Sequence, residues 1–156
     1  SNHRYKTSLL LESTSSRIES ILIEDIRYTR YQMEYIANQI KTKGATNENI
    51  ASFLGSFRVN SDVNVAISWN MFSWADRSKF ITIDGIEGVL DNPKDISTRD
   101  YLPETIKEPG ILHIGKPVFG AVTNQWIIPA GMGVTDRRGI YVGSIVFGFD
   151  IKNKSS

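Results

Sequence analysis

The side chains best suited to hold a small ligand lie in the second half of this 156-residue chain. The run Arg99-Asp100-Tyr101 places a guanidinium two residues before a phenol. A guanidinium presents a planar fork of donors that fits a carboxylate or a phosphate, and a tyrosine combines an aromatic ring with one polar tip. In a second interpretation, Arg99 pairs with Asp95 or Asp100 and only orders the loop. The residue types leave both interpretations open.

Aromatic residues form a second candidate group. Trp69 and Trp74 are close in the sequence, and Trp126 lies in a later predicted strand. Indole rings can line a ligand pocket through stacking or cation–π contacts, whereas in a small domain tryptophans also serve as core residues. Asp150, near the end of the last predicted strand, could receive an ammonium group of a ligand or lie in solvent at the strand end.

The patterns needed for catalysis are weak. The chain has no cysteine, which excludes a thiol nucleophile, a disulfide and thiolate metal sites. Its histidines are His3 and His113, too few for a multi-histidine metal site. Ser144, His113 and Asp136 supply the residue types of a hydrolase triad, but Ser144 lacks the spacing of a nucleophile elbow. We therefore expect neither an enzyme nor a cofactor or metal site.

Charge and glycine patterns exclude further classes. The 18 basic and 17 acidic residues nearly cancel, and no basic block predicts nucleic-acid binding. Gly131-Met132-Gly133 lies inside a strand pattern without a following helix, so it predicts no dinucleotide site. The middle section holds an acidic cluster whose spacing matches no calcium loop, and we interpret it as a solvated loop. Its members are Glu87, Asp91, Asp95 and Asp100.

A long helix precedes these candidates. No Gly or Pro occurs from about Tyr5 to Lys43, and apolar residues recur at intervals of three, four or seven between Ile18 and Ile40. Gly44 supplies a natural stop. A helix of about 35 residues is roughly 50 Å long. Because that exceeds what so small a domain can cover, we expect part of it to project or to pair with another chain.

The rest of the chain predicts a short helix and several strands. The helix covers Asn47–Phe57, with Asn47 as its N-cap. We expect Leu90–Gly110 to be loop with a helical turn near Arg99–Ile106, and residues 136–139 to form a hairpin turn with Gly139 in the left-handed position. The predicted strands are Val63–Trp69, Phe80–Ile83, Ile111–Ile114, Gln125–Val134 and Ile140–Ile151.

This order of elements predicts an α+β layer arrangement. In the last strand, the heavily aromatic face, with Tyr141, Phe147 and Phe149, should contact the long helix. The opposite face, which we expect to carry Val142, Ser144 and Gly148, should point toward Leu90–Gly110. A ligand pocket is expected between the sheet and that segment.

From Asp95 to Ile151 the sequence resembles the Cache domain, a PAS-like sensor module. Five pieces occur in the order that the family shows, and the order is more specific than any single piece. They are DISTRDY at 95–101, IGKPVFG at 114–120, WIIPA at 126–130, GVTDRRG at 133–139 and GSIVFGFDI at 143–151.

The resemblance implies a long N-terminal helix, residues 1–44, packed on a PAS-like antiparallel sheet of about five strands in a sensor core at 45–156, all within one structural domain. It implies a single Cache domain outside the cytoplasmic membrane, between two transmembrane helices of a bacterial receptor. Such a domain binds a small polar ligand and signals to a histidine kinase or diguanylate cyclase, as a homodimer through the N-terminal helix. A ligandless dimerisation or protein-docking module is the alternative.

The resemblance also suggests ligand contacts. In the branch of the family that binds amino acids, Arg99 matches the arginine that holds the ligand carboxylate. Tyr101 matches the aromatic residue that follows it, and Asp150 matches the aspartate that takes the amine. Lys94 and Leu102 stand where that branch has aromatic residues. These departures leave an organic acid or another small polar molecule open as the ligand.

Overall fold

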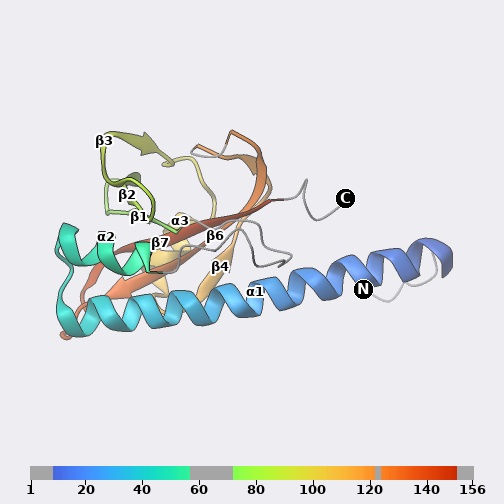
Figure 1. The fold of residues 1–156 in the computed structure, drawn as a ribbon, viewed down its shortest axis with the longest axis horizontal. Coiled ribbons are helices and arrows are strands. Elements are labelled where there is room, and N and C mark those ends of the chain that lie inside the picture. Colours follow the sequence, from blue (N-terminus) through green and yellow to red (C-terminus); the bar gives the residue numbers. More distant parts are fainter. Residues whose placement is uncertain (1–8, 57–71, 122–123, 151–156) are drawn as a thin grey trace.

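A long helix lies along one face of an antiparallel sheet (Figure 1). The computed structural model describes residues 9–56, 72–121 and 124–150, with side chains from Ile23 to Phe149. The predicted strand Val63–Trp69, including Trp69, lies outside the described residues. The predicted α+β class is confirmed, and within the described residues the sheet has seven strands where about five were expected.

Helix α1 spans Leu9–Lys43 and extends past the sheet at its N-terminal end (Figure 1). It ends where the sequence predicted. Gly44 has a φ of 110°, and its N–H donates to the carbonyl of Ile40 at 2.8 Å. Glycine adopts this left-handed conformation without the steric penalty of a side chain. The C-terminal half of α1 buries Met33 and Ile36 against the sheet.

Helix α2 spans Asn47–Gly55 and begins at a different N-cap from the predicted one. The side chain of Thr46, not Asn47, accepts the N–H of Asn49 at 3.1 Å. Thr46 has the extended backbone that an N-cap requires, whereas Asn47 is already helical. The side-chain amide of Asn49 (Nδ2) also donates hydrogen bonds to the backbone carbonyls of Lys43 and Gly44, and these bonds join α2 to the end of α1.

All strand pairs in the sheet are antiparallel, in the order β3-β2-β1-β7-β6-β4, and β5 also pairs with β6. The two longest strands, β6 and β7, pair with each other and form the hairpin that the sequence predicted. The strands are β1 Ser73–Ala75, β2 Phe80–Asp84, β3 Gly88–Asp95, β4 Leu112–Ile114, β5 Val118–Phe119, β6 Trp126–Thr135 and β7 Tyr141–Asp150.

The prediction of loop across Leu90–Gly110 was wrong in its first part. Strand β3 occupies Gly88–Asp95 and, among the strands that the structure describes, pairs with β2 alone, at the edge of the sheet. An edge strand keeps one side in solvent, so it tolerates polar residues and a proline such as Pro93 that a central strand would reject. The predicted helical turn is present as α3, Leu102–Lys107.

The two faces of the sheet have different neighbours. Ile145, Phe147 and Phe149 share a core with α1, as expected for the aromatic face of the last strand. Tyr141 and Val142, however, lie on the opposite sides from those predicted. Val142 packs against the core under α1, and the Tyr141 hydroxyl lies 2.7 Å from Ser144 Oγ. The pairing register shifts between Val134 and Thr135, and such an irregularity reverses the alternation of side chains.

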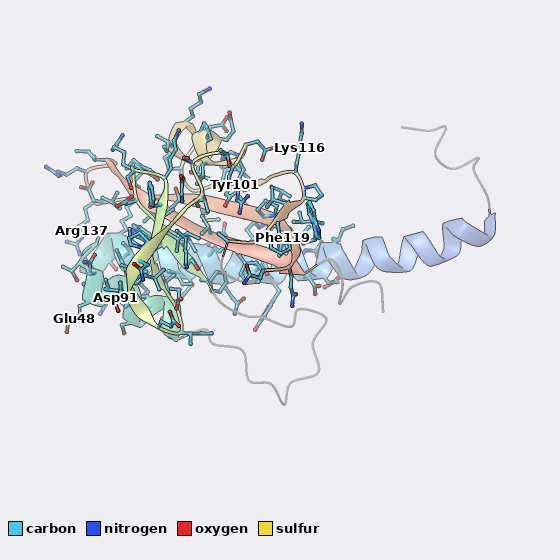
Figure 2. The ribbon with its side chains drawn as sticks, turned by 90° about the horizontal axis from the view of Figure 1, so that it is seen from above. Glu48, Asp91, Tyr101, Lys116, Phe119 and Arg137 are labelled. Atoms are coloured by element: carbon cyan, nitrogen blue, oxygen red, sulfur yellow. The ribbon has the colours of Figure 1, made fainter. Side chains whose placement is uncertain are left out.

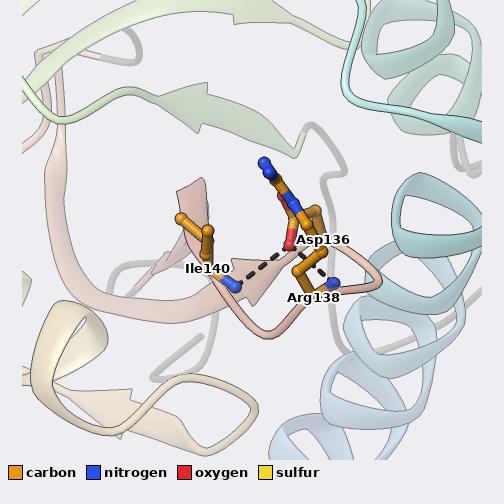
Figure 3. A network of polar contacts seen from close by, with 3 residues as sticks. All are labelled: Asp136, Arg138 and Ile140. Carbon is orange, nitrogen blue, oxygen red and sulfur yellow. Dashed lines mark hydrogen bonds and ion pairs between the residues drawn. The ribbon is translucent and has the colours of Figure 1, made fainter.

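The hairpin turn between β6 and β7 forms as predicted (Figure 3). One carboxylate oxygen of Asp136 accepts the N–H groups of Arg138 at 2.9 Å and Ile140 at 3.0 Å. Gly139 has a φ of 83°. The hydrogen bond from Ile140 is the main reason that the pKa of Asp136 is lowered.

Candidate ligand-binding site

A cavity opens on the face of the sheet that points away from α1. About 450 Å³ of space lies within its rim, open solvent included, so this is a partly open hollow and not an enclosed chamber. It lies between the sheet and the segment that leads from β3 to α3, where the sequence predicted a pocket. Most of the wall is apolar, and the polar side chains on it are Ser73, Arg99 and Tyr101. The remaining wall residues are Ile81, Ile96, Gly120, Ala121, Ile127, Pro129, Val146, Phe147 and Gly148.

Tyr101 enters this wall because two strand-side residues lack side chains. A Cβ at Gly131 would lie 2.7 Å from Cε2 of the Tyr101 ring, and a Cβ at Gly115 would lie 2.8 Å from its Cδ1. The ring therefore rests on bare backbone and is only 5% exposed. Burial raises the pKa of the Tyr101 phenol, so the hydroxyl stays a hydrogen-bond donor at neutral pH. That hydroxyl has no hydrogen-bond partner among the described residues.

Arg99, two residues before Tyr101 in the sequence, also lines this cavity. Its guanidinium donates one hydrogen bond, at 3.0 Å, to the carbonyl of Phe119 in β5. Within residues 23–56, 72–121 and 124–149, no carboxylate forms an ion pair with it. A guanidinium carries five N–H donors, so most of those on Arg99 remain available to an anion.

The alternative partners of Arg99 bond elsewhere. Asp95 accepts the backbone N–H of Ser97 at 2.8 Å, and hydrogen bonds from Ser97 lower its pKa. The Asp100 carboxylate faces the backbone N–H of Lys116, at 3.3 and 3.4 Å. Figure 2 shows Tyr101, Lys116 and Phe119 toward one end of the sheet, and Glu48, Asp91 and Arg137 toward the other.

The tryptophans with described side chains lie away from the cavity wall. Trp74 is 3% exposed in the core beneath α1, where a Cβ at Gly143 would overlap its indole. Trp126 is 60% exposed and meets Phe119 edge to face, with ring centroids 6.0 Å apart. Asp150 ends β7, where its backbone pairs with Ile127 of the cavity wall, and its side chain lies outside the described set.

The residue that sequence reasoning missed is Ser73. Its signal was available in principle, because Ser73 precedes Trp74 and neighbouring strand residues point to opposite faces. The predicted strand pattern stopped at Trp69, however, and β1 is only three residues long.

The residues of the conceivable hydrolase triad do not meet. The Ser144 hydroxyl lies against Thr105 and Tyr141, and His113 Nε2 lies 3.0 Å from the carbonyl of Glu108. In the part of the chain that the structure describes, no group of three or more His, Cys, Asp or Glu residues is placed to hold a metal ion. None of the described helices has the length and apolarity of a membrane span.

No protein-family model and no curated protein matches the sequence. Solved structures do match. The ligand-binding domain of the Pseudomonas fluorescens chemoreceptor CtaA, in complex with L-serine, aligns over 96% of this chain with a TM-score of 0.64 and 14% identity. The ligand-binding domain of the Campylobacter jejuni chemoreceptor Tlp3, in complex with 4-methylisoleucine, aligns over 97% with a TM-score of 0.58 and 15% identity.

A third match is the extracellular domain of rpHK1S-Z16, described as a histidine kinase. It aligns over 91% of this chain with a TM-score of 0.66 and 15% identity. The chain spans 61%, 64% and 59% of these three structures, less than two thirds of each. At this level of identity the likeness concerns the fold. The chain has the fold of the Cache-type sensor domains of bacterial receptors, as the sequence resemblance implied.

Proposed function

We propose that this chain is an extracytoplasmic sensor domain that binds a small molecule bearing a carboxylate. Arg99 would hold the carboxylate, and the Tyr101 hydroxyl would donate to one of its oxygens or to a neighbouring group. The observation that carries the proposal is the pair of donors on one cavity wall. Both have hydrogen-bonding capacity that no described protein group uses. A ligand that supplies acceptors to these donors would form charge-assisted hydrogen bonds and so stabilise this arrangement.

The structural neighbours support a ligand of this size and chemistry. CtaA was solved with L-serine and Tlp3 with 4-methylisoleucine, both of which carry a carboxylate. The amino groups of such ligands need an acceptor. In our proposal Asp150 takes this role if the ligand carries an ammonium group.

The cavity shares its wall with the core beneath α1, which supports a route for the signal. Phe147 lines the cavity and also packs in the cluster that contains Met33 and Ile36 of α1. A ligand that shifts β7 would change the packing of α1. In the proposed receptor, helix 1–44 would carry that change from the sensor core at 45–156 to a cytoplasmic kinase or cyclase. Coupling of about 1–3 kcal/mol between two states is enough for such a response.

The test is ligand binding measured by thermal shift and then by calorimetry, with a panel of amino acids, organic acids, amines and sugars. We expect carboxylates to raise the melting temperature. Arg99→Ala should weaken the best ligand by about 10-fold or more, since hydrogen bonds to charged groups contribute about 1.5–3 kcal/mol. Arg138→Ala is the matched control, because the side chain of Arg138 is 78% exposed and, within the described residues, pairs with Asp136 alone.

Unchanged affinity in Arg99→Ala would remove this residue from the site. Binding of no small molecule, together with association with protein partners or with a second copy, would favour the alternative, a ligandless dimerisation or docking module.

A further inference from the structure

Ser73 lies on the cavity wall at a point that the donors Arg99 and Tyr101 do not cover. Its neighbours Phe72 and Trp74 belong to the core beneath α1, so Ser73 points to the opposite face of β1. It pairs there with Val146 of β7, which also lines the cavity. Ser73 is only 4% exposed.

The hydroxyl of Ser73 has no hydrogen-bond partner within the part of the chain that the structure describes. Other buried hydroxyls on this face are paired. Ser144 Oγ lies 2.8 Å from Thr105 Oγ1, which donates to the carbonyl of Leu102 at 2.7 Å. Among the described residues, Thr29 Oγ1 is the side-chain oxygen that is both shielded from solvent and unpaired, so the unpaired Ser73 hydroxyl is open to the cavity that it lines. The hydroxyl can therefore form a hydrogen bond with a ligand in this cavity.

Ser73 and Arg99 mark opposite sides of the cavity. Arg99 is hydrogen-bonded to Phe119 in β5, whereas Ser73 belongs to β1, and strands β6 and β7 lie between them. With neighbouring strands about 4.8 Å apart, the backbones of β1 and β5 are separated by roughly 14 Å. The wall between them is formed by aliphatic residues such as Val146 and Pro129.

We propose that the Ser73 hydroxyl is a second polar contact of the ligand site and recognises a neutral oxygen at the end of the ligand opposite its carboxylate. The inference rests on the proposed function. It narrows the ligand to a monocarboxylate with a short apolar chain and a keto, hydroxyl or amide oxygen beyond it. A second carboxylate fits poorly, because among the described wall residues Arg99 is the one cation and a second buried anion would lack a counter-charge.

Calorimetry with matched acids tests this assignment. Three oxo acids, 4-oxopentanoate, 5-oxohexanoate and 6-oxoheptanoate, are each compared with the parent alkanoate, and glutarate serves as the dicarboxylate. We expect at least one oxo acid to bind about 3- to 10-fold more tightly than its parent, as a neutral hydrogen bond to a buried donor predicts. Ser73→Ala should remove that difference and leave the affinity for the parent acid unchanged. Ser52→Ala, at an exposed position of α2, is the control.

The melting temperature of the ligand-free variant gives a second readout. Because the hydroxyl has no partner, Ser73→Ala should melt at the same temperature as the original protein or higher, while its discrimination between oxo acid and parent is lost. A hydroxyl that serves the fold would instead lower the melting temperature when removed, and this result would overturn the inference. Equal binding of each oxo acid and its parent, with Arg99 still required, would also overturn it but leave the proposed function intact. If Arg99→Ala changes no ligand affinity, both fail.

Discussion

At the scale of single residues, aspartates shape the turns that follow the strands. Asp136 accepts two backbone N–H groups after β6, and Asp84 accepts those of Ile86 and Glu87 after β2. Asp76 accepts the N–H of Ser78 after β1, and Asp95 that of Ser97 after β3. Backbone N–H groups just past the end of a strand no longer pair with a neighbouring strand. The short carboxylate side chain of aspartate can accept hydrogen bonds from them, which is why aspartate favours these positions.

We expect Asp136 to make the hairpin sensitive to acid. Its lowered pKa means that the stability it contributes is present above the unfolded pKa of about 3.8 and is lost as the pH falls through the lower folded value. Asp136→Asn should therefore lower the melting temperature at pH 7, and the difference from the original protein should shrink below pH 4.

The measurement is the melting temperature from pH 7 to pH 3, followed by circular dichroism. Asp91→Asn is the control, at an exposed position of β3 with no hydrogen bond to its carboxylate within the described residues. A difference between Asp136→Asn and the original protein that stays constant with pH would contradict the assignment.

At the scale of elements, a chain of hydroxyls fastens α3 to the sheet. Tyr141 Oη lies 2.7 Å from Ser144 Oγ, and Ser144 Oγ lies 2.8 Å from Thr105 Oγ1 of α3. Both Ser144 and Thr105 are fully buried. The desolvation of Tyr141 raises the pKa of its phenol, which keeps its proton available to the chain. Since Tyr101 immediately precedes α3, this contact also helps to place the cavity wall.

Removal of one member should leave each neighbouring hydroxyl of the chain with one hydrogen bond fewer. We expect Ser144→Ala and Thr105→Val each to lower the free energy of unfolding by about 1–3 kcal/mol, and the double variant to lose less than the sum. Urea unfolding of the four proteins gives the coupling energy. Thr98→Val, at an exposed position outside the helices and strands, should change the stability by less than about 0.5 kcal/mol. Strictly additive losses would show that the hydroxyls act independently.

At the scale of the whole molecule, α1 is longer than the sheet that covers it (Figure 1). On its exposed surface Tyr28, Tyr31 and Tyr35 form a stripe at helical spacing, and the Arg30 guanidinium lies 5.5 Å from the centre of the Tyr31 ring. Aromatic residues are enriched where protein surfaces associate. We therefore propose this surface as the contact of the homodimer that the sequence resemblance implied.

Sedimentation velocity over a concentration series checks the proposed dimer. We expect a concentration-dependent dimer that the double variant Tyr28→Glu/Tyr31→Glu converts to monomer, because four like charges would face one another across the two-fold contact. Helix content should be unchanged. Ile86→Glu, at an exposed position in the turn between β2 and β3, should leave the association as it was. A monomer at every concentration would remove the dimer from the proposal for this chain.

Features that depend on neighbouring residues could be predicted from the sequence. The end of α1 at Gly44 and the turn at Asp136–Gly139 both depend on backbone conformations that a few residues impose. The aromatic face of β7 followed from simple alternation. The order of motifs also indicated the sensor fold, and with it a cavity beside Arg99 and Tyr101.

Other features were decided only by tertiary structure, because they depend on what lies across the sheet. The polar segment Gly88–Asp95 forms strand β3 because it lies at the edge of the described sheet, where water can form hydrogen bonds with its unpaired backbone groups. An irregular pairing near Gly143 turned Val142 toward α1 and Tyr141 away from it. Trp74 is buried and Trp126 exposed for the same kind of reason. Trp74 lies in the core beneath α1, whereas Trp126 lies at the start of β6 with most of its ring in solvent. No local sequence pattern carries that information.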